Sequence, residues 1–267
     1  MKSLKYWLLV LGILSCFGCS SSIHEDNRGC SFICDSIQYR VEFMSAGCVR
    51  ILSYPEGDTL VTKRLVVDVE KPTFTDYKWE ETEQAFVFCT HELLVSFDKS
   101  DEAFTFREAS TGKLLLKEKD RRKARNFKRS EVGGEQCLEV TQRFIPTDEE
   151  AIYGLGQYQN GIMNYRGKSV LLLQANMDIV NPFLISTNGY GILWDNYSST
   201  KFEDTKEGYS FTSEVGDASD YYFVYGKNMD EVLAGYRELT GDVPMFGKWV
   251  YGFWQSKERY KSFDELK

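Results

Sequence analysis

Histidine is scarce in this sequence, and its scarcity excludes several kinds of site. Only two of the 267 residues are histidines, His24 and His91, and they lie far apart along the chain. Two distant histidines are too few to build a metal site on imidazoles and are unsuited to a Ser-His-Asp triad. We therefore expect no metal and no cofactor. Proline and glycine occur at ordinary frequencies, with 5 and 21 residues, which argues against a disordered or collagen-like chain.

The sequence also lacks an apolar run of the roughly 20 residues that span a bilayer. A shorter apolar stretch occupies residues 7–14, and Lys2 and Lys5 precede it. A basic start followed by a short apolar run is typical of a targeting segment. We therefore expect residues 1–19 to be a signal peptide.

The end of this segment resembles a bacterial lipoprotein cleavage site, because Gly18 precedes Cys19 and three serines follow. We expect lipid attachment at Cys19, with Cys16 as the second candidate. An ordinary secretory signal followed by a flexible serine-rich stub is the alternative. Both interpretations predict export, and the first predicts a cell-envelope protein held to a membrane by its lipid anchor.

Basic residues are in deficit, since 32 Lys and Arg face 40 Asp and Glu for a formal net charge of −8. Loss of Lys2 and Lys5 with the leader makes the remaining chain still more acidic. The one basic cluster, residues 117–129, has Phe127 as its only aromatic residue and is interpreted as a solvated hairpin or loop. Nucleic acid is therefore not an expected partner.

Five cysteines remain after the leader, and none has the paired spacing of a zinc ribbon. Cys89 and Cys137 lie within apolar strand patterns, which predicts small buried side chains. A disulfide between Cys30 and Cys34 is an open alternative.

From about residue 30 to 225 the apolar pattern has a period of two, in short runs broken by Gly, Asn, Asp and Pro. Many short strands at close spacing predict an all-β antiparallel β-sandwich, which we assign to residues 20–228. Residues 110–113, with Gly112, read as a hairpin turn. The predicted strands are residues 39–43, 49–53, 60–68, 86–97, 104–108, 136–144, 191–196 and 221–225.

The pattern changes at Asn228, a good helix N-cap, and acidic residues follow in the first turn. Apolar residues then recur on one helical face until Gly241 and Pro244 end the pattern. The sequence predicts a helix over Met229–Thr240, within a connector of residues 229–245.

Residues 248–255 are apolar on both alternations, as in a strand that is covered on both faces in a parallel sheet. A nascent helix follows from Phe263. One strand and one helix cannot bury themselves, so we interpret residues 246–267 as the start of an incomplete barrel, in a protein that is longer or whose reading frame is interrupted.

Three ordered segments carry a family resemblance: YGLGQ at 153–157, NPFLIS and GYGILWDN at 181–186 and 189–196, and YRELTG, GKW and GFWQSKERY within 236–260. Together they are similar to glycoside hydrolase family 31, especially its α-xylosidase-like members. The resemblance implies a galactose-mutarotase-like sandwich followed by the first strand of a truncated (β/α)8 barrel.

The resemblance also implies substrate contacts. Residues 157–177 form a long polar loop that in this family reaches over the barrel mouth, and Asn176 or Asp178 matches the polar residue near its end. A plain turn is the alternative for these two residues. Amide and carboxylate groups suit sugar hydroxyls. Further candidates follow the first barrel strand, namely Trp254, Gln255, Lys257 and Arg259. Residues 194–196 are interpreted as structural, with Trp194 packed on its strand and Asp195 and Asn196 forming a side-chain-to-backbone turn.

In the family two Asp residues on later barrel strands perform a retaining displacement, and neither maps onto this sequence. We therefore assign no catalytic residue. The leading hypothesis is the N-terminal portion of an α-glycosidase that acts on terminal α-xylosyl or α-glucosyl units of oligosaccharides. The alternative is a non-catalytic glycan-binding lipoprotein. A mutarotase-like epimerase would need histidine chemistry, which two distant histidines do not supply.

Overall fold

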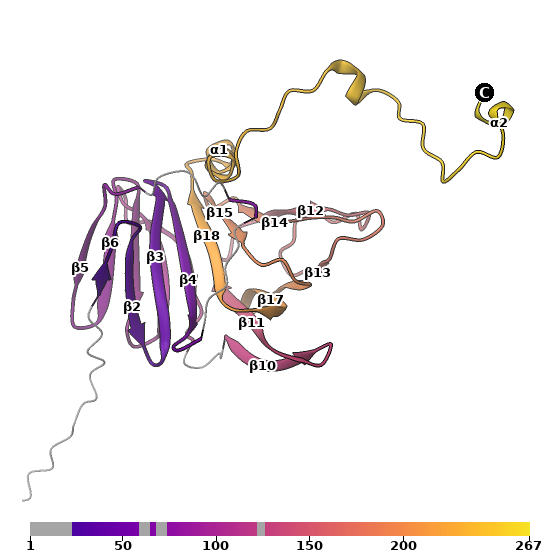
Figure 1. Cartoon of the computed structure of the whole chain (residues 1–267). Coiled ribbons are helices and arrows are strands. Elements are labelled where there is room, and N and C mark those ends of the chain that lie inside the picture. The colour runs from indigo at the N-terminus through magenta and orange to yellow at the C-terminus, as the bar shows by residue number, and fades with distance from the viewer. Residues whose placement is uncertain (1–22, 59–64, 68–73, 122–125) are drawn as a thin grey trace, which may run out of the picture.

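The computed structural model describes residues 23–58, 65–67, 74–121 and 126–267. The predicted signal peptide and Cys19 lie outside these residues, as does most of the strand predicted over residues 60–68. Two antiparallel sheets make up the body of the molecule (Figure 1). The all-β sandwich predicted from the period of two is confirmed.

The first sheet has eight strands among the described residues. In spatial order they are β1 (His24–Glu25), β2 (Cys30–Cys34), β3 (Ile37–Ser45), β4 (Cys48–Pro55), β18 (Ser219–Tyr225), β15 (Tyr190–Trp194), β14 (Ile179–Ser186) and β12 (Ile152–Gln157).

The second sheet has ten strands in the same described ranges. In spatial order they are β13 (Ser169–Leu172), β16 (Thr200–Thr205), β17 (Gly208–Gly216), β11 (Glu135–Ile145), β9 (Leu114–Glu118), β8 (Ala103–Glu108), β7 (Leu93–Asp98), β6 (Ala85–Cys89) and β5 (Lys78–Glu81), with β10 (Phe127–Val132) paired to β11.

The core between the sheets is rich in aromatic rings. Phe106 on β8 stacks on Phe223 of β18 with ring centroids 4.2 Å apart, and Trp194 on β15 stacks on Phe211 of β17 at 5.6 Å. All four side chains are buried. Each pair joins one sheet to the other, so offset stacking of inward-facing rings fixes how the two sheets face.

The single strand predicted over residues 86–97 is wrong, because the chain reverses in its middle and forms β6 and β7. Thr90 closes this turn without glycine or proline. Its hydroxyl accepts from the backbone N–H of Leu93 at 2.9 Å and donates to the carbonyl of Ala46 at 2.7 Å. In the sequence this turn is marked only by the short polar run Thr90-His91-Glu92.

The predicted hairpin turn is confirmed, since β8 ends at Glu108 and β9 begins at Leu114. Gly112 has a φ of +72°, a conformation that favours glycine.

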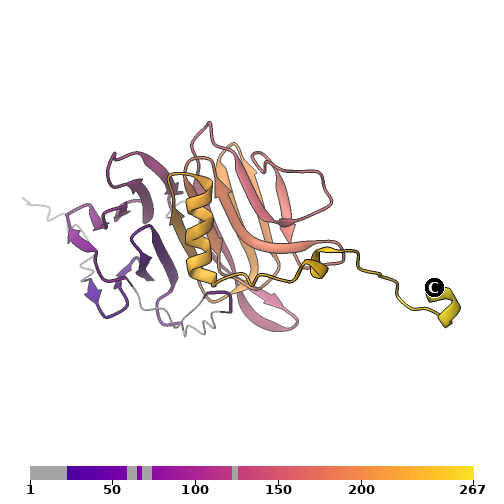
Figure 2. The ribbon, with the colours of Figure 1, turned by 90° about the horizontal axis from the view of Figure 1, so that it is seen from above.

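The predicted helix is confirmed at its predicted bounds as α1 (Met229–Thr240), and the Asn228 side chain accepts from the backbone N–H of Glu231. The helix packs on the outer face of the first sheet (Figure 2). Val232 and Leu239 are buried there, and Tyr236 stacks on Phe183 with centroids 4.2 Å apart. Burial of this face anchors the connector to β14, β15 and β18.

The strand predicted over residues 248–255 is wrong. The structure has a 3-10 helix, η1 (Lys248–Tyr251), then irregular chain and a short helix, α2 (Phe263–Leu266). A strand is stabilised by hydrogen bonds to at least one neighbouring strand, and no strand of the described residues pairs with this tail, which leads away from the sandwich (Figure 1). Trp249 and Phe253 are 74% and 88% exposed.

The prediction that Cys89 and Cys137 are buried is wrong, and the structure decides the open alternative of a Cys30–Cys34 disulfide against the bond. Cys30 and Cys34 are free, and they lie four residues apart on β2, which separates them by about 13 Å at the rise of a strand. Cys89 is exposed and Cys137 is half-buried. Both side chains lie on the outward alternation of strands that cover the core on one face only. In the described ranges, no helix has the length and apolar character needed to cross a membrane.

Candidate functional site

The glycine-rich segment at residues 153–157 forms most of β12, and its glycines have a structural reason. Gly154 and Gly156 have φ values of +102° and +116°. A Cβ atom on Gly156 would lie 2.0 Å from the carbonyl oxygen of Ile179, and one on Gly154 would lie 2.5 Å from that of Phe183. These glycines permit the close approach of β12 to β14 across a bulge.

The single long loop predicted over residues 157–177 is wrong, because β13 pairs with β16 and divides it into a loop of residues 158–168 and a turn of residues 173–178. The first of these, the loop after β12, is held by polar contacts and one buried ring. Asn164 accepts from the backbone N–H of Ile152 at 3.1 Å, and Tyr165 is buried against the core. Arg166 lies 3.8 Å from Glu150 and 3.4 Å from Asp204. Asn164, Tyr165 and Arg166 therefore anchor the loop and position the chain that follows.

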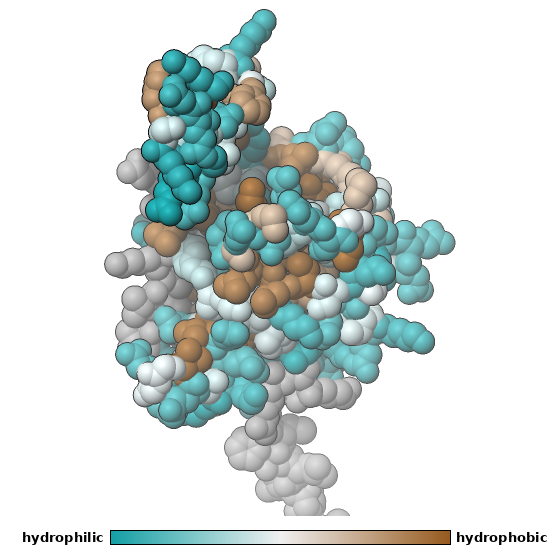
Figure 3. All heavy atoms as spheres, turned by 90° about the vertical axis from the view of Figure 1, so that its right-hand side faces the viewer, coloured by the Kyte–Doolittle hydropathy of each residue, from teal (hydrophilic) through white to brown (hydrophobic). Residues whose placement is uncertain are grey.

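The predicted sugar contacts Asn176 and Asp178 lie at the tip of the turn between β13 and β14. Ala175 and Asp178 form an isolated bridge, with N–O distances of 3.3 and 3.4 Å, and Met177 has a φ of +68°. Asn176 is exposed and Asp178 is half-buried. Apolar surface gathers at this end of the molecule, where Met163, Leu171 and Met177 are exposed (Figure 3).

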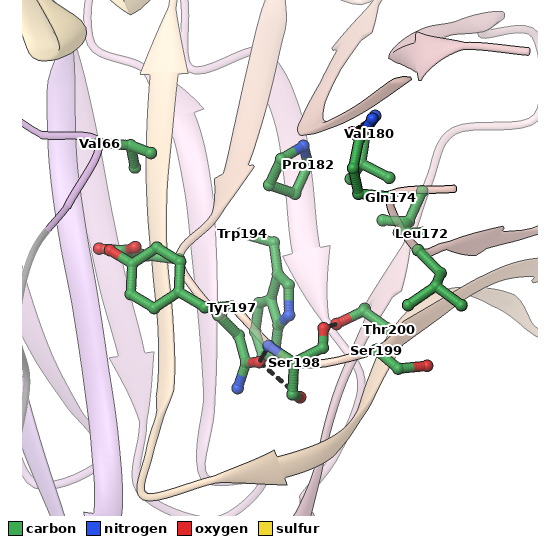
Figure 4. A pocket seen from close by; sticks show the side chains of 13 residues that line it. Val66, Leu172, Gln174, Val180, Pro182, Trp194, Tyr197, Ser198, Ser199 and Thr200 are labelled. Carbon is green, nitrogen blue, oxygen red and sulfur yellow. Dashed lines mark hydrogen bonds between the residues drawn. The ribbon is translucent and has the colours of Figure 1, made fainter. Parts of the chain in front are cut away.

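A pocket of about 280 Å³ lies at the base of this turn (Figure 4). In the close view Tyr197 and Val66 lie on one side, Gln174 and Leu172 on the other, with Pro182 along the top. The lining comes from β13, β14, the segment after β15 and the Val66 segment. Its residues are Val66, Leu172, Leu173, Gln174, Val180, Pro182, Trp194, Asp195, Asn196, Tyr197, Ser198, Ser199 and Thr200.

One wall of the pocket carries a hydrogen-bonded chain from a carboxylate to the backbone. The Tyr197 hydroxyl accepts from the backbone N–H of Leu65 at 2.7 Å and is hydrogen-bonded to Asp195. Burial, reinforced by the nearby charge of Asp220, raises the pKa of Asp195 to about 6. Oδ1 of Asp195 is buried without a hydrogen-bond partner among the described residues.

The structural interpretation of the WDN motif is confirmed for two of its three residues. Trp194 is buried and its indole N–H donates to the Ser213 hydroxyl at 2.9 Å. Asn196 accepts from the backbone N–H of Ser198 at 2.8 Å, as in a side-chain turn. Sequence reasoning missed the pocket because its lining comes from separate segments, and the polar run after Trp194 was its only signal.

The predicted site residues of the tail are not brought to this pocket. Trp254 is 63% exposed and donates to the carbonyl of Val250 at 2.7 Å, whereas Gln255 is hydrogen-bonded to Tyr260. Lys257 forms an ion pair with Glu265, and Arg259 is exposed. All of these contacts are local to the tail, so the role of these four residues in substrate binding stays a prediction.

The buried carboxylates of the sandwich are engaged in structural bonds. Asp220 receives two hydrogen bonds from Arg50, and Glu118 accepts from Arg121 at 2.8 Å and from the Tyr221 hydroxyl at 2.7 Å. Over the residues with assigned positions, no three His, Cys, Asp or Glu side chains are grouped to hold a metal ion. The geometry thus offers a polar turn and a small pocket as the places for ligand contact.

Comparison with known proteins places this geometry in a family. Residues 38–203 match the model of the glycosyl hydrolase 31 N-terminal galactose mutarotase-like domain. An α-xylosidase of Saccharolobus solfataricus is 37% identical over 246 residues, covering 86% of this chain and 32% of the relative. The α-glucosidase 2 of Bacillus thermoamyloliquefaciens is 28% identical, covering 89% of this chain and 30% of the relative.

The solved structures agree on the fold. The α-xylosidase of Xanthomonas citri superposes with a TM-score of 0.78 at 24% identity, over 91% of this chain and 43% of that one. The chain spans about a third of the length of the curated relatives it matches. On the family model and the 37% identical relative together, the chain belongs to glycosyl hydrolase family 31 and contains its N-terminal galactose mutarotase-like domain.

Proposed function

We propose that this chain is the N-terminal portion of a retaining α-glycosidase that hydrolyses terminal α-linked xylosyl or glucosyl units of oligosaccharides. The observation that carries the proposal is the family sandwich itself, with α1 docked on its outer face and an anchored polar loop at one end. Similarity to an α-xylosidase over most of the chain supports the substrate class.

The loop geometry supports a role in substrate contact. Glu150, Arg166 and Asp204 hold the loop that leads into β13, and Asn176 and Asp178 lie at the tip of the turn that follows β13, where their side chains form no hydrogen bond within the described residues. An anchored loop with polar groups at an exposed tip is suited to bind sugar hydroxyls at low entropic cost.

We also propose that the 267-residue chain alone does not hydrolyse glycosides. A retaining mechanism needs two carboxyl groups about 5 to 5.5 Å apart across an open site. Asp220 and Glu118 are buried in ion pairs, and Asp195 is partly buried beside Tyr197. These arrangements support a structural rather than a catalytic role for the acidic residues of the sandwich.

The cell envelope is the proposed location, with Cys19 as the acylated residue. The support is the sequence alone: a basic start, a short apolar run and the Gly18-Cys19 junction. Mass spectrometry of the mature N-terminus should find an acylated Cys19. An unmodified chain that stays in the cytoplasm would contradict this location.

Hydrolysis of aryl α-xylosides and α-glucosides tests the function. We expect no turnover by the 267-residue chain and turnover with retention of configuration by a protein extended through a complete barrel. In the extended protein, Asn176→Ala should raise KM more than it lowers kcat, with Asn160→Ala, in the loop before β13, as the control. Hydrolysis by the short chain that one carboxylate substitution abolishes would reject the proposal.

A further inference from the structure

We propose that the pocket between Tyr197 and Gln174 binds one neutral pyranose ring. This inference rests on the proposed function, because a glycan is the ligand it assumes. The pocket volume of about 280 Å³ lies just below the usual range for small-ligand sites, about 300 to 1,000 Å³. Such a space holds a single ring rather than an oligosaccharide.

The polar wall of the pocket is fixed by hydrogen bonds within the protein. The Ser198 hydroxyl donates to the Val215 carbonyl at 2.7 Å, and the Asn196 amide donates to the same carbonyl at 3.0 Å. Thr200 and Ser213 share a hydrogen bond of 2.6 Å. Because these groups are already bonded, the wall keeps its shape without a ligand, which lowers the entropic cost of binding.

Two polar groups on the lining remain available for a ligand. Gln174 uses its side-chain oxygen to accept from the backbone N–H of Val180 at 3.1 Å, which leaves its amide nitrogen without a hydrogen-bond partner among the described residues. The Ser199 hydroxyl likewise has no hydrogen-bond partner among the described residues. An amide donor and a hydroxyl that both donates and accepts match the hydroxyl groups of a sugar.

An aromatic and an apolar surface complete the recognition. The Tyr197 side chain is 53% exposed, and its hydroxyl is already held by Leu65 and Asp195. Its ring is thus fixed at the rim, with Val66 beside it and Pro182 nearby (Figure 4). A held aromatic ring offers a flat apolar face to the C–H face of a pyranose.

Charge selects the kind of sugar. Asp195 lines the pocket, whereas the nearby Asp220 is paired with Arg50 and does not line it. An anionic sugar would place a second negative charge beside the Asp195 carboxylate, which is unfavourable in a partly desolvated site. A neutral pyranose is therefore the expected ligand, and a uronic acid is excluded.

Nuclear magnetic resonance titration of the purified protein tests the pocket directly. With methyl α-D-xyloside or methyl α-D-glucoside, we expect saturable shifts of the backbone amides of residues 172–174 and 197–200, with a Kd of about 1 mM or weaker. Amides of β10 serve as the internal control. Methyl α-D-glucuronide should cause no saturable shift. Absence of shifts with both neutral sugars, or an equal response to the uronide, would overturn the proposal.

Two variants locate the contacts. Ser199→Ala removes one hydroxyl, and Gln174→Glu keeps the oxygen that accepts from Val180 while it removes the donor. Each should weaken binding about three- to tenfold, as expected for one hydrogen bond. Asn160→Ala, in the loop between β12 and β13 and outside the pocket lining, should leave the affinity unchanged. An unchanged affinity in both pocket variants, or an equal loss with Asn160→Ala, would contradict the assignment.

Failure of the pocket proposal can be distinguished from failure of the proposed function. Sugar binding is measured on the 267-residue chain, whereas hydrolysis is measured on the extended protein. Hydrolysis without pocket shifts refutes the pocket alone, and pocket shifts without hydrolysis refute the enzyme alone.

Discussion

The guanidinium of Arg50 on β4 donates to both carboxylate oxygens of Asp220 on β18, and both side chains are almost fully buried on the outer face of the first sheet. Arg50 also donates to Glu42 at 2.9 Å. Residues 170 positions apart in the sequence thus form one buried ion pair.

Removal of this pair's negative partner should be strongly destabilising. Asp220→Asn keeps the shape but leaves the buried Arg50 charge with less compensation, and we expect a loss of about 3 to 5 kcal/mol in the free energy of unfolding. Denaturant titration measures it. Lys201→Met, which breaks the exposed pair with Glu203, is the control and should cost less than about 1 kcal/mol. A similar small loss for Asp220→Asn would show that the pair is not needed.

Asp195 should make stability depend on pH. Its pKa in the folded protein, about 6, lies above the unfolded value of about 3.9, so its stabilising contribution is complete below about pH 4 and is lost as pH rises through 6. Asn at this position cannot ionise. Asp195→Asn should therefore raise the free energy of unfolding by about 1 to 2 kcal/mol at pH 7, relative to its effect at pH 4. Equal effects at both pH values would contradict the raised pKa.

Alanine substitutions at Gly156 and Gly161 distinguish the cost of a steric clash from the cost of a left-handed backbone conformation. Both have positive φ, but a Cβ on Gly156 meets the Ile179 carbonyl at 2.0 Å and one on Gly161 meets open space. Gly161→Ala should cost about 1 kcal/mol in unfolding free energy, the usual cost of the left-handed conformation. Gly156→Ala should cost clearly more, because β12 must move away from β14. Thermal unfolding compares them, and equal losses would refute the close approach.

The Asn228 cap should contribute to the docking of α1. Its side chain accepts from the backbone N–H of Glu231 at 3.0 Å, while the Glu231 carboxylate accepts from that of Lys227 at 2.9 Å. Asn228→Ala should lower the free energy of unfolding by about 1 kcal/mol. Asn176→Ala, an exposed turn position, should have no measurable effect. A neutral Asn228→Ala would mean that packing on the sheet alone holds the helix.

The exposed tail should promote association. Met245, Trp249 and Phe253 are 94%, 74% and 88% exposed. Truncation at about residue 243 removes this apolar surface and should shift sedimentation profiles toward the monomer without lowering the thermal midpoint of the sandwich. Phe246→Ser alone should have a smaller effect. Unchanged association after truncation would place the contact elsewhere.

The sequence by itself determined the features that depend on neighbouring residues. Asn228, the acidic first turn and Gly241 were sufficient to place α1 at Met229–Thr240, because capping and helical periodicity act within a few residues. The period of two gave the sandwich, and Gly112 marked a turn that the backbone could form only with a positive φ. The structural interpretation of Trp194 and Asn196 followed from the same local chemistry.

Only the tertiary structure decided what depends on partners distant in the chain. Thr90 ends a strand through a hydrogen bond to the carbonyl of Ala46, and Arg50 on β4 pairs with Asp220 on the neighbouring β18. Neither contact is visible as a local pattern in the sequence. The pocket lies where the Gln174 turn meets the Tyr197 segment, and no residue spacing in the sequence predicts it. Conversely, residues 248–255 have the apolar pattern of a buried strand, but no neighbouring strand of the described residues pairs with them. Because a strand is stabilised by hydrogen bonds to other strands, pattern alone does not make it one.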